Sequence, residues 1–448
     1  MSSQLGELCY NAYNKLDRYP FIFDARRIKM ADNSNLSMAK SSKKDEFYTQ
    51  YSDIEAEMNA YVEFNPDVFR DKTILLPCDD HEWSNFTRYF ATNFERLGLK
   101  KLISTSYANS AGSKQLTLFE EFSPTYDKNK HDKHGKIFTV TRDENKSGQI
   151  NSDDIVLAGY LDGGGDFRSD EVTKLRDESD IIITNPPFSL FREFLAWIME
   201  ANKQFIIVGN QNAITYKEVF PLLKENKIWL GNGFKGNVGF FSSPYEDKAL
   251  AADHRDGFIR VSGVMWFTNI DLCKRHKTLL LDTMEHNLKF NKRLRKKLEK
   301  EYGIIEYPHY DNYDAIEVPF TDAIPSDYEG VMGVPITFMD KYNPEQFDIV
   351  SFRKGEDGKD LVFTRERERE FNRTFVSLYD VDSRSDEQSE RYKSAWEEYI
   401  CKSNNQTEIE PIDLFFPLCI TNRAAGTMNG IINGKETYRR VLIRKKGE

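Results

Sequence analysis

Short runs of apolar residues alternate, along the middle of the chain, with segments in which apolar residues recur every three or four positions. The continuous runs predict buried strands, and the segments with helical spacing predict amphipathic helices. Strands are expected at 72–77, 100–107, 155–160, 180–184, 204–210 and 227–233. Helices are expected at 83–98, which ends at Gly98, and at 170–178, 190–203 and 215–227. This succession of strand, helix and strand predicts an α/β fold with an open, mostly parallel sheet.

The pattern changes on both sides of this segment. Residues 1–40 contain a short amphipathic stretch and a polar linker, so we treat them as an N-terminal extension. The main domain is predicted at 41–270. It includes a helix at 53–64, a polar excursion at 109–153 with a strand at 136–141, and strands at 238–241 and 258–267 that suit an antiparallel edge. Residues 271–448 predict a smaller domain of mixed α+β structure.

Composition narrows the class of protein. The chain has 448 residues, of which 39% are apolar and 30% charged, enough to bury a core. A formal net charge of −10 excludes a polycation that coats nucleic acid by charge alone. The five cysteines form no paired motif, so we expect no disulfide framework, no metal site and a cytoplasmic location. No signal peptide and no membrane span are expected, because no apolar stretch reaches about 18 residues.

The strongest candidate for chemistry is the sequence Asn185-Pro186-Pro187-Phe188, directly after the predicted strand 180–184. Open α/β sheets bind ligands at the carboxyl ends of their strands. The prolines stiffen the loop, and the Asn185 side-chain oxygen and the Pro186 carbonyl can accept both hydrogens of a planar amino group. Phe188 can stack on the heterocycle that carries this group, once the base has left its duplex. The alternative is a stiff turn with a buried ring, but the position after a strand favours a function.

Two other predicted strand ends carry candidate binding residues. Three glycines at 163–165 allow a close approach of backbone to ligand, and Asp166 and Phe167 follow them, although a flexible surface turn would look the same. Asp79 and Asp80 could receive hydroxyl or ammonium groups, or this segment could simply cap the next helix through Asp80 or Ser84. No GxGxxG motif is present, so dinucleotide binding is not predicted.

Several longer strings occur together in this chain. In order they are DEFYTQYSDIEAEM (45–58), PCDDHEWSNF (77–86), GDFRSDEV (165–172), ITNPPFSLFREF (183–194), GVPITFMDKYNPEQFD (333–348) and YRRVLIRKK (438–446). In these strings the sequence resembles the EcoRI-type adenine-specific DNA methyltransferase family. The resemblance implies a Rossmann-like methyltransferase sheet, S-adenosylmethionine as methyl donor, and the exocyclic amino group of adenine in double-stranded DNA as acceptor.

The resemblance also implies roles for individual residues. The catalytic loop would be Asn185, Pro186, Pro187 and Phe188. The cofactor would be held by Tyr48 and Thr49 at its methionine end, by Asp79 and Asp80 at the usual cofactor loop, and by Asp166 and Phe167 at its adenine. In contrast to the wider methyltransferase pattern, no acid ends the second strand to hold the ribose hydroxyls. Residues 271–448 would recognise the target sequence, and a cognate restriction endonuclease acting on that sequence is a possible partner.

Other interpretations stay open at this level. The same loop could methylate cytosine, RNA or a protein glutamine, and a catalytically silent DNA-binding relative would keep the fold. Asp348 with Asp357 and Lys359 weakly resembles a nuclease metal cluster. The basic run at 292–297 could face phosphates or be an ordinary solvated helix face, and the charged repeat at 365–370 is better explained as a helix surface.

Overall fold

The computed structural model describes residues 48–77, 79, 84–108, 125–131, 133–143, 147–150, 154–242, 254–255, 258–310, 314–352, 430–432 and 435–447. The predictions for the N-terminal extension, for Asp80, for Asp357 and Lys359, and for the charged repeat at 365–370 lie outside these residues.

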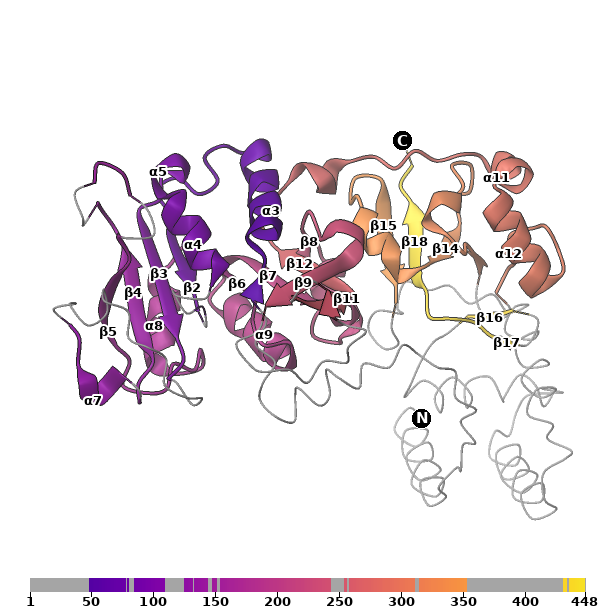
Figure 1. The fold of residues 1–448 in the computed structure, drawn as a ribbon. Coiled ribbons are helices and arrows are strands. Elements are labelled where there is room, and N and C mark those ends of the chain that lie inside the picture. The colour runs from indigo at the N-terminus through magenta and orange to yellow at the C-terminus, as the bar shows by residue number, and fades with distance from the viewer. Residues whose placement is uncertain are drawn as a thin grey trace, which may run out of the picture.

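A large mixed sheet occupies the indigo and magenta half of the molecule (Figure 1). Within the described residues, its strand order is β5-β4-β3-β2-β6-β7-β12-β8. Strands β3, β2, β6 and β7 are parallel neighbours, whereas β4 and β12 run antiparallel to theirs. The bounds are β2 Thr73–Leu76, β3 Lys101–Ser106, β4 Lys136–Val140, β5 Val156–Tyr160, β6 Ile181–Thr184, β7 Gln204–Asn210, β8 Trp229–Leu230 and β12 Val264–Thr268. The predicted α/β class is confirmed.

Both faces of this sheet are buried, because successive residues of a strand point to opposite sides. In β2, Ile74 and Leu76 pack into one core cluster and Leu75 into the other. The first cluster includes residues of α3 (Tyr51–Phe64), α4 (Asn85–Thr92) and α5 (Phe94–Leu97). The second includes residues of α8 (Asp170–Glu178), α9 (Phe191–Glu200) and α10 (Phe220–Lys224). Burial on two sides explains why the central strands are continuous apolar runs.

Local signals set several helix ends. The Ser84 hydroxyl accepts from the backbone N–H groups of Phe86 and Thr87 and so caps α4. Gly98, with φ of 65°, ends α5 in the left-handed conformation, as its position in the sequence predicts. The expected helix at 215–227 is shorter than predicted, because Pro221 lies in the first turn of α10 and the preceding residues 211–215 form a 3-10 turn.

The predicted strand at 258–267 is two strands in two sheets. It breaks at Gly263, whose φ of +71° ends β11 (Phe258–Ser262) before β12 begins. Strand β11 belongs to a small antiparallel sheet of order β1-β9-β11-β10. The other members are β1 (Tyr48–Thr49), β9 (Val238–Ser242) and β10 (His254–Arg255). The expected antiparallel edge of the main sheet therefore consists of β12 with β8, and not of 238–241.

A third sheet lies in the orange and yellow half of the molecule (Figure 1). Its order is β13-β14-β18-β15, so that the C-terminal strand β18 lies between two strands formed much earlier in the chain. The bounds here are β13 Ala315–Glu317, β14 Val331–Val334, β15 Phe347–Ser351 and β18 Val441–Lys445, with α11 Met284–Phe290, α12 Lys292–Tyr302 and a separate pair, β16 Ile431–Ile432 and β17 Lys435–Glu436. The short α7 (Lys128–His131) precedes β4.

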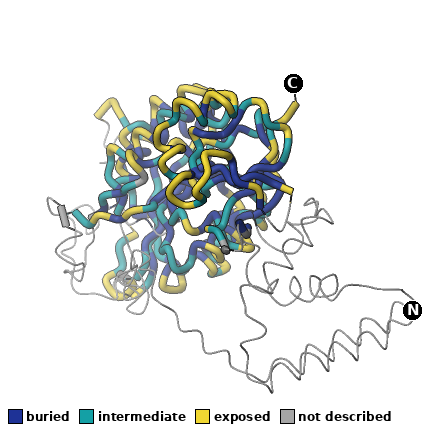
Figure 2. Tube along the Cα trace, turned by 90° about the vertical axis from the view of Figure 1, so that its right-hand side faces the viewer, coloured by how far each residue is buried: buried dark blue, intermediate teal, exposed yellow. Residues whose placement is uncertain are grey.

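The third sheet shares a hydrophobic core with the main sheet. One cluster of buried side chains includes residues of α9 and α10, Leu294 and Leu298 of α12, and residues of the strands β13, β14, β15 and β18. Figure 2 shows the buried residues of the described chain in dark blue. A predicted domain boundary near 270 falls just after β12, and apolar packing continues across it.

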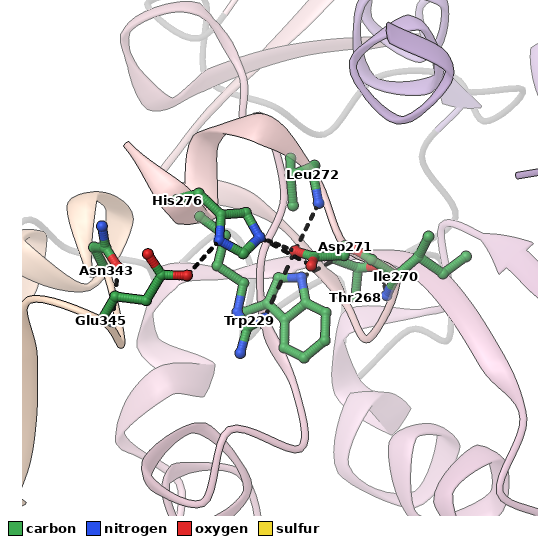
Figure 3. A network of polar contacts seen from close by, with 9 residues as sticks. Trp229, Thr268, Ile270, Asp271, Leu272, His276, Asn343 and Glu345 are labelled. Carbon is green, nitrogen blue, oxygen red and sulfur yellow. Dashed lines mark hydrogen bonds and ion pairs between the residues drawn. The ribbon is translucent and has the colours of Figure 1, made fainter. Parts of the chain in front are cut away.

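Polar contacts join the two parts beside this core (Figure 3). The imidazole of His276 contacts Asp271 at 2.9 Å and Glu345, just before β15, at 3.0 Å. The Lys274 ammonium group lies 2.6 Å from Asp340 and donates to the carbonyls of Gly231 and Asn232. The segment directly after β12 is thus bonded to both the main sheet and the C-terminal sheet.

Candidate active site

The order of the strands identifies where a ligand can bind. From β2 the chain passes through α4 and α5 to β3 on one side, whereas β5 leads through α8 to β6 on the other side of β2. Such a switch point leaves a crevice at the carboxyl ends of the central strands. The residues that follow β2, end β3 and follow β6 are Asp79, Ser106 and Asn185. The structure therefore brings three strand ends together, two of which carry residues predicted from sequence.

The loop of Asn185 begins where β6 ends. The Thr184 hydroxyl donates to the Pro77 carbonyl at 2.9 Å, which ties the end of β6 to the end of β2. Asn185 is half-buried, and its Nδ2 donates to Thr49 Oγ1 at 3.3 Å. Pro186 is buried and Pro187 has φ of −52°, so the backbone of the loop is fixed. The side chain of Asn185 thus stands on a stiff support at the carboxyl end of β6, with its Oδ1 buried.

Phe188 is half-buried. It begins a short 3-10 turn, Phe188–Leu190, and packs against the core cluster on the α3 and α4 face of the sheet. This packing agrees with the alternative of a stiff turn that supports a ring, and stacking of Phe188 on a base stays a prediction.

Tyr48 and Thr49 form β1, which pairs with β9. Thr49 is buried, and its carbonyl accepts from Asn85 Nδ2 at 2.8 Å. Asn85 is the first residue of α4. This contact, together with the bond from Asn185, places the N-terminal segment beside the loop after β6. Thr49 and Asn185 are 136 positions apart in the sequence, so it is the fold that brings them together.

Asp79 lies in the interior, with an exposed fraction of 5%. Its Oδ1 accepts from the Ser84 hydroxyl at 2.7 Å, and its carbonyl accepts from the Ser104 hydroxyl of β3. Ser84 is the helix cap, so Asp79 supports the cap that sequence reasoning offered as an alternative. The loop after β2 is in this way bonded to both α4 and β3.

The glycine turn at 163–165 packs closely against the end of β3. Gly165 has φ of +91°, and a Cβ at this position would lie 2.5 Å from the Ser106 carbonyl oxygen. The Gly164 carbonyl accepts from Ala108 N–H at 2.8 Å, and the Gly163 carbonyl accepts from Gly135 N–H at 2.8 Å. Around the Cα of Gly163, by contrast, an added Cβ would meet no atom within 4 Å. The turn is fixed on one side and open on the other.

Asp166 and Phe167 point to different environments. Asp166 is half-buried and bonded to Arg168 at 2.7 Å, and these bonds hold the pKa of its carboxyl below the usual range. The ring of Phe167 is fully buried and packs edge-on against Phe194, with ring centroids 4.9 Å apart. The ring therefore anchors the turn to α9, which differs from the expectation that it lies against the cofactor adenine.

Sequence reasoning missed Ser106. Its hydroxyl is buried at the end of β3 and has no hydrogen-bond partner among the residues that the structure describes. A buried polar atom without a partner is rare in native proteins and requires an explanation, such as a missing ligand. The sequence showed only that this strand ends in polar residues, and this is too common among strands to single out Ser106.

Two observations concern the described part of the chain as a whole. No group of three or more histidine, cysteine, aspartate or glutamate side chains there is arranged to hold a metal ion. Asp348, considered above for a nuclease cluster, pairs instead with Lys446 at 3.2 Å. No described helix combines the length and apolar character that crossing a bilayer would need.

Comparison with known proteins decides the family. A model of the family described as adenine-specific methyltransferase EcoRI matches residues 35–446. The chain belongs to this family. Over 336 residues it is 45% identical to the type II methyltransferase M.EcoRI of Escherichia coli, with 74% of this chain and 93% of that one covered.

Two further relatives of this family come from mycoplasmas. The type II methyltransferase M.MgeORF184P of Mycoplasma genitalium is 35% identical, with 70% of this chain and 85% of that one covered. The type II methyltransferase M.MpnI of Mycoplasma pneumoniae is 33% identical, over 70% of this chain and 83% of that one. No solved structure matches.

Family membership implies a methyl donor, and the residues at the strand ends suit one. The unpartnered Ser106 hydroxyl offers a hydrogen bond, the glycine turn leaves open space beside it, and the Asp166 carboxylate is kept charged by Arg168. Ser106 ends β3 and the glycine turn with Asp166 follows β5, while the Asn185 loop follows β6.

Proposed function

We propose that this protein transfers a methyl group from S-adenosylmethionine to the exocyclic amino group of adenine within a specific sequence of double-stranded DNA. Membership of the EcoRI family supports the reaction class. The observation that carries the proposal is the position of Asn185, which follows β6 directly and stands on a proline-stiffened loop at the topological switch point. In the cell, the reaction would protect DNA from a restriction endonuclease that acts on the same sequence.

The acceptor side of the site consists of Asn185, Pro186 and Phe188. The Oδ1 of Asn185 and the Pro186 carbonyl accept the two hydrogens of the adenine amino group, and this directs the nitrogen lone pair toward the methyl donor. Phe188 supports the everted base by stacking. Rate acceleration then comes mainly from positioning and from neutral acceptors that stabilise the charge developing on nitrogen.

The donor side is the crevice between the loops after β2, β3 and β5. When bound, S-adenosylmethionine supplies an electrophilic methyl group on a sulfonium. Tyr48 and Thr49 hold its methionine end, and Asp166 its adenine. Asp79 and the hydroxyl of Ser106 would contact the ribose, and Asp80, which lies outside the described residues, stays a candidate for the same role. Ser106 here occupies the strand end at which the sequence has no acid.

Residues 271–448 recognise the target sequence in this proposal. Helix α12 carries a row of exposed lysines, Lys292, Lys296 and Lys300, four residues apart and hence on one face. No ion pair involves these three side chains within the described structure. Unpaired cations on an acidic protein suit contact with phosphates.

The test is methyl transfer from labelled S-adenosylmethionine to genomic DNA, followed by identification of the modified nucleoside and its sequence context. The expected product is N6-methyladenine at one recurring sequence. Asn185→Ala should abolish transfer and leave cofactor binding nearly intact. Asn65→Ala is the matched control, because Asn65 is exposed at the far end of α3.

Two results would contradict the proposal. Label found in methylcytosine, RNA or protein would favour the other substrates named above. Full activity of Asn185→Ala would remove the loop from the reaction.

A further inference from the structure

The amide of Asn185 has two chemically different ends, of which only one can serve the proposed reaction. Its oxygen accepts hydrogen bonds, whereas its nitrogen only donates. A half-turn about the last side-chain torsion exchanges the two ends, and that torsion has broad, nearly two-fold preferences. The stiff loop fixes the backbone of Asn185 but not this torsion. A bond from a neighbouring group can help to hold the amide in the orientation in which the oxygen faces the substrate.

Thr49 makes such a bond in the orientation that the structure shows. Asn185 Nδ2 donates to the Thr49 hydroxyl at 3.3 Å, which engages the nitrogen end of the amide. Thr49 is only 1% exposed, so water competes little for this bond. With the nitrogen end held toward β1, the oxygen end is the one that can be turned to an amino group in the crevice.

The backbone of Thr49 is held by its neighbours. Thr49 is opposite Phe241 in the β1 and β9 pair, and its carbonyl accepts from Asn85 Nδ2 at 2.8 Å. Asn85 follows Ser84, whose hydroxyl donates to Asp79. A series of short contacts thus leads from the loop after β2, through the start of α4 and β1, to the amide of Asn185.

We propose that Thr49 is a positioning residue, whose hydroxyl orients Asn185 so that Oδ1 faces the adenine amino group. This inference rests on the proposed function and adds to the expected cofactor contact of the same residue. The two roles are distinguished by different measurements. Loss of the cofactor contact changes affinity for S-adenosylmethionine, whereas loss of orientation changes the rate of transfer once both substrates are bound.

The experiment compares Thr49→Val with Thr49→Ser. Valine keeps the shape and removes the hydroxyl, and serine keeps the hydroxyl. Neither changes the backbone bonds to β9 and Asn85. The matched control is Thr73→Val, because Thr73 is also a buried strand threonine but begins β2 at the opposite edge, and its bonds to Asp180 are made by its backbone.

The readouts are the single-turnover rate at saturating DNA and S-adenosylmethionine, and the Kd for each. For Thr49→Val the single-turnover rate at saturation should fall about tenfold, the scale of one neutral hydrogen bond, with the Kd for DNA unchanged. Any rise in the Kd for S-adenosylmethionine reports the separate cofactor contact. Thr49→Ser should restore most of the rate, and Thr73→Val should match the wild type.

The inference fails if Thr49→Val transfers at the wild-type rate, if it loses only affinity for S-adenosylmethionine, or if serine does not restore the rate. These outcomes count against Thr49 when the wild type methylates adenine and Asn185→Ala is inactive. Failure of those two conditions would instead overturn the proposed function.

Discussion

Replacement of Gly165 by alanine tests whether the turn after β5 must pack closely on β3. Gly165 has φ of +91°, and a Cβ there would lie 2.5 Å from the carbonyl oxygen of Ser106 and 3.2 Å from the Cα of Tyr107. Both neighbours are backbone atoms of a strand end, so neither can move aside as a flexible side chain would. Either the turn or the end of β3 must shift.

The loss of folding stability expected for Gly165→Ala has two contributions, and a substitution at a second glycine separates them. Gly148 has φ of +90°, but an added Cβ would meet nothing within 4 Å. The strain of the left-handed conformation, about 1–2 kcal/mol, is therefore common to Gly148→Ala and Gly165→Ala. The close contact adds about 1–3 kcal/mol at Gly165 alone, the usual cost of overpacking.

Urea denaturation and calorimetric titration with S-adenosylmethionine measure the two consequences. Gly165→Ala should unfold at a lower urea concentration than Gly148→Ala. It should also bind the cofactor at least about tenfold more weakly, because the turn shifts. A tenfold loss of affinity corresponds to about 1.4 kcal/mol of binding free energy. Gly148→Ala should bind like the wild type. Equal urea midpoints and equal affinities for the two variants would refute the argument from close packing.

Three further substitutions test other parts of the candidate site and the polar contacts between the main sheet and the C-terminal sheet. Phe188→Ala should weaken binding of target DNA by roughly tenfold in a fluorescence titration, because stacking on a base is worth about 1–3 kcal/mol, and should leave cofactor affinity unchanged. Asp166→Ala should raise the Kd for S-adenosylmethionine measured by calorimetry, because it removes a carboxylate that Arg168 keeps charged by holding its pKa low. Hydrogen bonds to Asp271 and Glu345 raise the pKa of His276, so protonated His276 stabilises the fold below the ordinary histidine pKa, and this stability is lost as pH rises through the raised value. His276→Gln should therefore lower the urea midpoint at acidic pH and have little effect at alkaline pH; an equal loss at both would contradict this assignment.

The sequence predicted those features that depend on nearby residues. The central strands are recognisable because both faces are buried, which makes 181–183 and 205–208 continuous apolar runs. The loop at 185–188 could be placed at a ligand-binding edge because a strand end and two prolines are local signals. Ser84 could be recognised as a helix cap for the same reason.

Features that depend on distant contacts could not be predicted in the same way. A two-residue strand such as β1 has no periodicity, so nothing in the sequence indicated that Thr49 would contact Asn185. Phe167 was expected at the cofactor because it follows the glycine turn, but its side chain points toward α9, and alternation within a turn does not fix direction. The insertion of β18 between β14 and β15 likewise depends on pairing across a long separation.

The contacts between the main sheet and the C-terminal sheet would couple recognition of the DNA sequence to methyl transfer. If residues 271–448 recognise the DNA sequence, as proposed, their docking on the DNA must place the target adenine correctly relative to Asn185. Buried Glu57 of α3 accepts from the N–H groups of Asn232 and Gly233, both at 2.9 Å, and Lys274 bonds the same loop to Asp340.

Since α3 follows Thr49 after a single residue, these bonds connect the C-terminal sheet to the segment that contacts the proposed catalytic loop. The shared hydrophobic core leaves little freedom for a hinge between the two parts. A misplacement of about 1 Å can reduce a rate by about a hundredfold. A rigid connection would therefore make transfer depend on correct docking of the target sequence, without a separate conformational switch.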